Sequence, residues 1–206
     1  MTEKNIPELT RRLNMPLPGQ PAQSLMAPSF RPDFPDKITS AQAGVLVLLY
    51  PNPIELYIVL IKRSEYPGAH SGQISFPGGK SEPRDLNIIE TALRETQEEI
   101  GVYATDIKVL GQLTPLYIPV SEFEVRPVVC FIPKKPEFRI DKNEVQYTIE
   151  ASIGYLLQPF AKAIQPLFAN DKFQGQVPYF DIEGNEVWGA TAMILSEFLE
   201  IAKLIN

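Results

Sequence analysis

The stretch GQISFPGGKSEPRDLNIIETALRETQEEIGV, residues 72–102, joins a glycine-rich turn to an acidic helix, and it decides the fold. Asn87 is placed to cap the start of the helix, with Glu90 three residues later as in a capping box. Gly101 suits the left-handed position that follows a last helical residue. Residues 77–79 are typical of a turn and have little side-chain bulk, which lets backbone atoms approach a metal or a phosphate. The pattern predicts a strand, a glycine loop and a helix, in that order.

Three glutamates, Glu95, Glu98 and Glu99, fall within an arc of roughly 100° if each helical residue turns about 100°. One face of the helix can therefore pack while another holds acid. Like charges on one face repel each other, and a hard divalent cation that prefers oxygen ligands offsets that repulsion. The simpler interpretation is a solvated charged face, but the adjacent glycine loop favours a metal. The residues of the packing arc are Ile89, Ala92, Leu93, Thr96 and Ile100.

This segment resembles a Nudix box. The family pattern is Gly, five residues, Glu, seven residues, then Arg-Glu-aliphatic-any-Glu-Glu-any-Gly-aliphatic. Residues 94–102 match its second half, with Thr96 where an aliphatic residue is usual. Counting from Gly79 puts Asp85 at the acidic position and leaves eight residues, not seven, before Arg94.

The extra residue resembles a variant found in the coenzyme A pyrophosphatase branch of the superfamily. That branch also carries an upstream signature, to which LIKRSEYPGAHSGQISFPGG is similar. Ile61 departs from the signature where Thr is usual, and Gly68 departs where Arg is usual. The matching positions are Arg63, Ser64, Gly72 and residues 76–79.

The resemblance implies an α/β (α+β) fold, the Nudix α/β/α sandwich with a mixed central sheet. It also implies Mg²⁺ or Mn²⁺, held by Glu95, Glu98, Glu99 and the carbonyl of Gly79. Such a cation neutralises phosphate oxygens and activates a water molecule. The resemblance also implies that Arg94 is an orienting ion-pair partner, whose guanidinium binds a neighbouring carboxylate through two N–H groups.

Further candidates for the site lie outside the helix. Glu144 lies in a loop similar to a Glu-Val context of the coenzyme A branch, and it is a candidate general base or extra metal ligand. Together with Glu98, Glu95 and Arg94 it makes up the predicted catalytic set. Arg63, at a strand end, is a candidate for binding an anionic substrate group, as are Gly78 and Gly79.

Several residues have a structural role as their simpler or equal interpretation. Asp85 and Glu82 precede the helix, and each is either a supporting acid, a charge at the helix N-terminus or a solvated residue. Trp188, Phe123 and Tyr117 could stack on a base, but packing is the favoured role for such aromatics. The single histidine, His70, is not enough to build a His-based zinc site or a Ser-His-Asp triad. We predict a structural or loop role for it, with contact to a phosphate as the less favoured alternative.

The composition limits the classes of protein to which the chain can belong. With 206 residues, 44% hydrophobic and 21% charged, the chain is large enough for one sizeable core. A net charge of −6 and a pI near 5.0 argue against a general nucleic-acid binder. The single cysteine, Cys130, excludes an internal disulfide, suits a cytosol, and is expected in the core. No apolar run reaches membrane-spanning length, so we predict a cytoplasmic protein without a membrane partner.

The chain divides into residues 1–39, a proline-rich extension, and residues 40–206, the Nudix hydrolase domain. Seven prolines disfavour long regular structure in the extension, which we expect to lie extended on the domain or on a partner subunit. The alternative is that the extension contacts the substrate. Only residues 6–13 are predicted as a short helix there. A homodimer is possible. Further expectations are strands at 43–50 and 56–63, a hairpin turning at 183–185 and an amphipathic helix over 190–205.

These features favour an enzyme that cleaves coenzyme A or acyl-coenzyme A at the diphosphate. The expected products are 4′-phosphopantetheine, or its acyl form, and adenosine 3′,5′-bisphosphate. A second hypothesis is a Nudix hydrolase of another nucleoside diphosphate compound, such as NADH, ADP-ribose or a dinucleoside polyphosphate. A third is a nucleotide sensor that binds without cleaving, and a fourth is an interaction module that uses the proline-rich extension.

Overall fold

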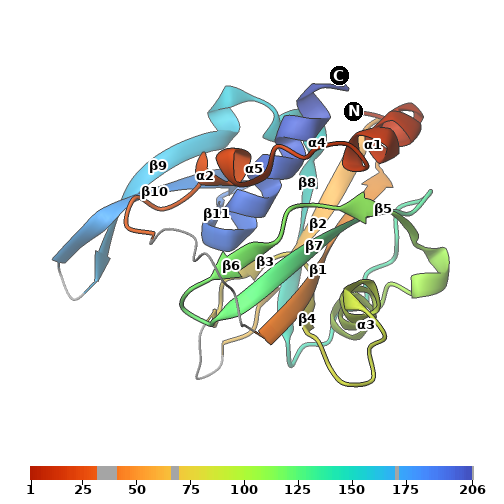
Figure 1. Cartoon of the computed structure of the whole chain (residues 1–206), viewed down its shortest axis with the longest axis horizontal. Helices are drawn as coiled ribbons and strands as arrows, with labels where there is room; N and C mark the ends of the chain where they lie inside the picture. Colours follow the sequence, from red (N-terminus) through yellow and green to blue (C-terminus); the bar gives the residue numbers. More distant parts are fainter. Residues whose placement is uncertain (32–40, 66–69, 170–171, 206) are drawn as a thin grey trace.

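A mixed sheet forms the centre of the computed structural model, which describes residues 1–31, 41–65, 70–169 and 172–205. In these residues the sheet has eight strands, and β1 runs parallel to β7 but antiparallel to β2 and β4 (Figure 1). The remaining pairs are antiparallel. The strands are β1 (Ala41–Pro51), β2 (Leu56–Arg63), β3 (Ile74–Ser75), β4 (Gly78–Lys80), β5 (Lys108–Gln112), β6 (Leu116–Ile118), β7 (Phe123–Phe131) and β8 (Val145–Ser152).

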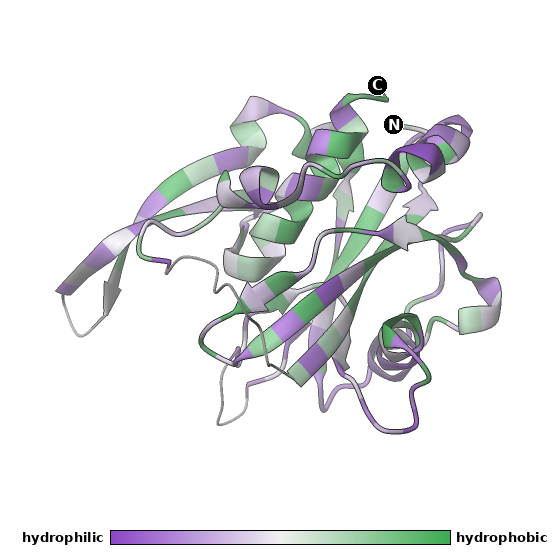
Figure 2. Cartoon of the chain, in the orientation of Figure 1, coloured by the Kyte–Doolittle hydropathy of each residue, from purple (hydrophilic) through white to green (hydrophobic). Residues whose placement is uncertain are grey.

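Helices cover both faces of this sheet. The apolar run of β1 is buried on both sides, which is why its residues alternate between two separate hydrophobic clusters. Helix α3 (Ile88–Ile100) packs on one face, and α5 (Gly189–Lys203) packs on the other with α1 (Ile6–Leu13) and α2 (Gly19–Ser24). Hydrophobic residues recur along the central strands and α5 (Figure 2). The predicted α/β/α sandwich with a mixed sheet is confirmed.

The acidic helix begins and ends where its capping residues predict. Asn87 accepts hydrogen bonds at Oδ1 from the N–H groups of Ile89 (3.0 Å) and Glu90 (3.1 Å), and Gly101 has φ 71°. The capping-box detail is wrong, because the Glu90 carboxylate accepts from the N–H of Leu86, one residue before the cap. Helix α3 packs directly against β1.

The N-terminal segment, which we define as residues 1–31, is not an extended arm. The predicted helix over 6–13 is confirmed as α1, and α2 is an addition that the sequence did not indicate. Pro7 is tolerated because it lies in the first turn of α1. Apolar side chains of this segment, Leu9 and Met26 among them, are buried in the core. The predicted boundary between residues 39 and 40 lies outside the described residues.

A second, three-stranded antiparallel sheet follows the first in the sequence. Its strands are β9 (Lys162–Ala169), β10 (Lys172–Ile182) and β11 (Asn185–Trp188), and the β9–β10 ribbon extends away from the body (Figure 1). The predicted hairpin is confirmed, with Glu183 (φ 54°) and Gly184 (φ 81°) at its turn. The short helices are η1 (Glu3–Asn5), η2 (Ala104–Asp106), α4 (Ile153–Leu156) and η3 (Pro159–Ala161).

The prediction of an amphipathic C-terminal helix is wrong for α5. Eleven of its 15 residues are buried, because the sheet and the N-terminal segment enclose it. Glu197 has no exposed surface, and its carboxylate accepts hydrogen bonds from Gly19, Gln23 and Thr114. This buried network ties α2 and the β5–β6 turn to α5. No helix in the described part of the chain is long and apolar enough to cross a bilayer.

Candidate active site

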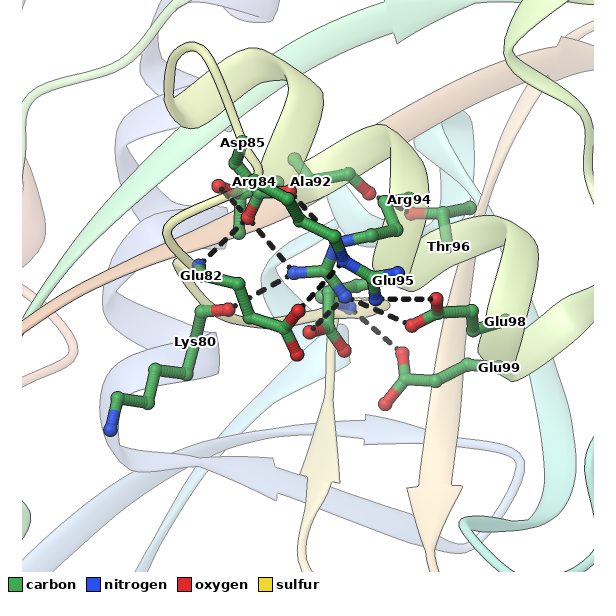
Figure 3. A network of polar contacts seen from close by, with 12 residues as sticks. Lys80, Glu82, Arg84, Asp85, Ala92, Arg94, Glu95, Thr96, Glu98 and Glu99 are labelled. Carbon is green, nitrogen blue, oxygen red and sulfur yellow. Dashed lines mark hydrogen bonds and ion pairs between the residues drawn. The ribbon is translucent and has the colours of Figure 1, made fainter.

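Arg94 lies at the centre of a network of acidic side chains on α3 and the preceding turn (Figure 3). Its Nε and Nη2 donate to the two oxygens of Asp85 at 2.9 and 3.0 Å. Its Nη1 donates to Glu95 at 2.8 Å and to Glu98 at 2.9 Å, and Nη2 also contacts the carbonyl of Lys80 at 3.2 Å. The guanidinium thus forks onto a carboxylate, as the sequence predicts, and touches two of the three glutamates.

The side chain of Asp85 is held in place so that its carboxylate faces the guanidinium of Arg94. It also accepts hydrogen bonds from the Thr91 hydroxyl and the Glu82 N–H, both at 2.9 Å. Hydrogen bonding from Arg94 holds the pKa of Asp85 well below its usual range and raises that of Arg94. The side chain of Glu82 instead pairs with Arg84 at 2.7 Å. Arg84 also contacts Glu98 at 3.3 Å. Asp85 therefore supports the network through Arg94, and Glu82 is linked to it through Arg84.

The three glutamates lie on the same helix but in different environments. The exposed fraction of the side chain is 48% for Glu98, 16% for Glu95 and 1% for Glu99. Glu99 accepts from the Gly78 N–H at 2.8 Å and from Nη1 of Arg63 at 3.2 Å. Burial raises the pKa of Glu99 to about 8 despite these two donors. Burial also raises the pKa of Glu95.

Gly78 and Gly79 form the short strand β4, not the predicted loop. They pair with β1, and a Cβ at Gly78 would lie 2.3 Å from the carbonyl oxygen of Gly44. A Cβ at Gly79 would lie 2.4 Å from Oε2 of Glu95. The glycines are needed because β1 and a glutamate of α3 both approach the strand at this distance.

Glu144 is brought to the same site although it is distant in the sequence. Its carbonyl accepts from the Ser64 N–H at 2.8 Å, next to the place where β2 pairs with β8. Its negative charge acts on Glu95 and Glu99 and contributes to raising the pKa of each. The Glu144 side chain is exposed. Its role as a general base stays a prediction.

A pocket of about 460 Å³ adjoins the acidic network. It reaches Arg63, Gly78 and Gly79, the three residues predicted to bind the anionic part of the substrate. The remaining walls come from the N-terminal segment, β1, the segment before β4, the β6–β7 turn and the start of α5. Most of these wall residues are apolar. The site therefore consists of a charged end and an apolar hollow.

His70 joins two walls of this pocket. Its Nδ1 lies 3.0 Å from Oε1 of Gln73, and its Nε2 lies 3.1 Å from Oγ of Ser121 in the β6–β7 turn. All three residues line the pocket. These contacts fit the predicted loop role for the histidine.

The aromatic candidates divide between the pocket and its surroundings. Trp188 and Phe123 line the pocket, so packing is not their only available role. Tyr117 contributes its carbonyl, which accepts a hydrogen bond from the guanidinium of Arg31. Phe30 and Arg31 also line the pocket, although sequence reasoning named neither as a site residue. The proline-rich segment that carries them has no periodicity that could have indicated this.

The sequence departs from the coenzyme A signature at two positions, and only one of them lies within the described residues. Ile61 is fully buried in β2, where an apolar side chain packs against the core. Gly68 lies outside the described residues. Cys130 is buried in β7, which confirms the predicted core role.

The acidic network suits a hard divalent cation in the chemistry of its donors. Carboxylate oxygens are the preferred ligands of Mg²⁺ and Mn²⁺. Across residues 1–31, 41–65, 70–169 and 172–205, however, no three His, Cys, Asp or Glu side chains converge closely enough to hold a metal ion as they stand. Arg94 lies between Glu95 and Glu98 (Figure 3). Glu99 instead accepts a hydrogen bond from the Gly78 N–H. A cation nearby would favour the ionised form of Glu99.

Comparison with known proteins agrees with this architecture. Residues 41–159 match the family model described as the NUDIX domain. The uncharacterized Nudix hydrolase NudL of Yersinia enterocolitica is 35% identical over 160 residues, covering 76% of this chain and 78% of that protein. The human mitochondrial coenzyme A diphosphatase NUDT8 is 33% identical over 164 residues, covering 78% of this chain and 69% of that protein.

A solved structure supports the fold. The Nudix hydrolase RenU of M. smegmatis superposes with a TM-score of 0.51 at 11% identity, covering 80% of this chain and 85% of that one. Domain match, relatives and fold agree with the arrangement of the glycine strand and the acidic helix. The chain therefore belongs to the Nudix hydrolase family and is a pyrophosphohydrolase.

Proposed function

We propose that this enzyme hydrolyses the diphosphate bond of coenzyme A or acyl-coenzyme A. The products are 4′-phosphopantetheine, or its acyl form, and adenosine 3′,5′-bisphosphate. One observation carries the proposal: the acidic network meets a largely apolar pocket at Arg63, Gly78 and Gly79. A substrate that joins a diphosphate to a long arm matches this combination. The similarity to a human coenzyme A diphosphatase supports it.

Nudix hydrolases generally need divalent metal ions. We infer that the ion is Mg²⁺ or Mn²⁺ and that Glu95, Glu98, Glu99 and the carbonyl of Gly79 hold it. When bound, such an ion neutralises negative charge on phosphate oxygens and lowers the pKa of a water molecule.

Two arginines of the site have separate roles, one in positioning the glutamates and one in binding the substrate. Arg94, fixed by Asp85, keeps Glu95 and Glu98 in position. Arg63 lines the pocket beside Glu99 and is the cation that meets a non-bridging phosphate oxygen.

Glu144 accepts the proton of the attacking water. The new bond joins the water oxygen to one phosphorus, while the bond from that phosphorus to the bridging oxygen breaks. The electron pair of that bond leaves with the second phosphate group. The apolar walls of the pocket reduce the access of other water molecules to the reacting atoms.

The experiment that tests this proposal is a panel of substrates with product identification. Purified protein is incubated with Mg²⁺ or Mn²⁺ and coenzyme A, acyl-coenzyme A, NADH, ADP-ribose or diadenosine polyphosphates. We expect kcat/KM to be highest for coenzyme A or its acyl form, with the two named products. Faster cleavage of ADP-ribose or NADH would overturn the substrate but leave the hydrolase. Binding without turnover under any divalent cation would favour a nucleotide sensor.

A further inference from the structure

The end of the N-terminal segment is held against β10 by hydrogen bonds between Ser29 and Gln176. The Ser29 N–H donates to the carbonyl of Gln176 at 2.9 Å, and the Gln176 N–H donates to Oγ of Ser29 at 2.8 Å. A Cβ at Gly175 would lie 2.4 Å from Oγ of Ser29 and 2.9 Å from Cδ1 of Phe30. The absence of a side chain at this strand position therefore lets the segment lie against β10.

Phe30 lines the pocket from this fastened segment. It remains 44% exposed, whereas Leu9 and Met26 of the same segment are buried in the core. The next residue, Arg31, donates to the carbonyl of Tyr117 and so connects the segment to β6. Phe30 is thus an apolar group held at the pocket by contacts on both of its sides. It lies outside residues 41–159, the part of the chain that matches the family model.

The walls of the pocket favour an aliphatic ligand over a purine base. They include Ile118, Val120 and Ile194 together with Trp188. Some of the polar side chains at the pocket already bond to one another or to the backbone, such as His70 to Ser121 and Thr191 to the carbonyl of Ile74. A purine would bury ring nitrogens that need hydrogen bonds, whereas an aliphatic chain only has to leave water.

We propose that the pocket binds the acyl chain of an acyl-coenzyme A and that Phe30 is a specificity-determining residue that favours the acylated substrate over free coenzyme A. The inference rests on the proposed function for the identity of the substrate. Phe30 contributes contact area to the chain and does not touch the reacting phosphates. Its loss therefore weakens discrimination between the two substrates.

The test measures binding in EDTA, where hydrolysis does not interfere. Isothermal titration gives the Kd of octanoyl-coenzyme A and of coenzyme A for the wild type, Phe30→Ala and Phe160→Ala. Phe160 is a matched control, because it is 70% exposed and is not among the pocket residues. Trp188, the only tryptophan of the chain, reports whether the ligand enters the pocket.

We expect the wild type to bind octanoyl-coenzyme A about tenfold or more tightly than coenzyme A, since each buried methylene adds to affinity. Phe30→Ala should narrow that ratio about fivefold, through loss of buried contact area, while Phe160→Ala keeps it. Octanoyl-coenzyme A should change the emission of Trp188 more than coenzyme A does. Equal affinity of the wild type for the two ligands would overturn the proposal. So would an unchanged ratio in Phe30→Ala or a silent Trp188 at saturation.

A turnover assay on the same proteins separates this inference from the proposed function. If octanoyl-coenzyme A binds as expected but neither ligand is hydrolysed with Mg²⁺ or Mn²⁺, the proposed function fails and the binding inference stands. If coenzyme A is hydrolysed but kcat/KM is equal for both substrates in the wild type and Phe30→Ala, the inference fails and the function stands.

Discussion

Asp85 binds Arg94 through both of its carboxylate oxygens, at 2.9 and 3.0 Å. This geometry fixes the plane of the guanidinium and directs its Nη1 to Glu95 and Glu98. The extra residue between Asp85 and Arg94, relative to the usual box, is compatible with this contact. Asp85 therefore acts on the glutamates through Arg94.

Substituting Asp85 tests this positioning role. Asp85→Asn removes one charge-assisted hydrogen bond and should lower kcat/KM about 10- to 100-fold, as is typical for partners of metal-ligating groups. The affinity for Mn²⁺ should fall with it. The control is Asp106→Asn, an exposed aspartate after the helix. Steady-state kinetics and Mn²⁺ titration provide the check, and equal activity of the two variants would contradict the role.

The two glycines of β4 should respond differently to alanine. A Cβ at Gly79 meets the movable end of Glu95, so Gly79→Ala should lower kcat while the free energy of unfolding changes little. A Cβ at Gly78 meets the backbone of β1, and the residue has φ 144°, so Gly78→Ala should cost about 2 kcal/mol or more of stability. Urea denaturation and kinetics on both variants test this contrast. Equal stability losses would refute it.

Stability without metal should depend on pH through Glu99. Its pKa is raised from an ordinary 4.5 to about 8, mainly by burial. Between those values the folded chain keeps a proton that the unfolded chain releases, so the stabilising contribution is full below pH 4.5 and is lost as the pH rises to about 8. Glu99→Gln cannot titrate, and its free energy of unfolding should fall less over this range. Urea denaturation in EDTA from pH 5 to 8 measures both slopes; parallel slopes would exclude Glu99 as the source.

Glu197 should be one of the most sensitive positions outside the site. Its carboxylate accepts hydrogen bonds from Gly19, Gln23 and Thr114 with no exposure to water. Glu197→Ala leaves these donors unsatisfied and should cost about 3 kcal/mol or more of unfolding free energy. The N-terminal segment should also become more accessible to protease. Glu200→Ala, which breaks a surface contact to Lys203, should cost no more than about 1 kcal/mol and is the control.

The sequence predicts the central helix and strands well because their signals are local. Asn87 and Gly101 mark the ends of α3, and the long apolar run of β1 requires burial on both faces. The glutamates, the arginine and the glycines of the site lie within this one segment, so spacing alone brings most of the network together.

Features that depend on tertiary contacts could not be predicted in the same way. The separate environments of Glu98 and Glu99 arise from the approach of β4, which periodicity along the helix does not reveal. The buried state of Glu197 depends on α2, which packs on α5 only in the folded chain. Phe30 reaches the pocket for the same reason: its placement is set by the contact between Ser29 and Gln176.

Metal binding by the acidic residues of α3 is tested most directly by titrating Mn²⁺ into the wild type and Glu98→Gln, with turnover of coenzyme A measured on the same samples. We predict that Glu98→Gln keeps the circular dichroism spectrum of the wild type, binds Mn²⁺ much more weakly and loses activity by about two orders of magnitude or more. Unchanged Mn²⁺ affinity together with unchanged turnover in this variant would contradict the metal site.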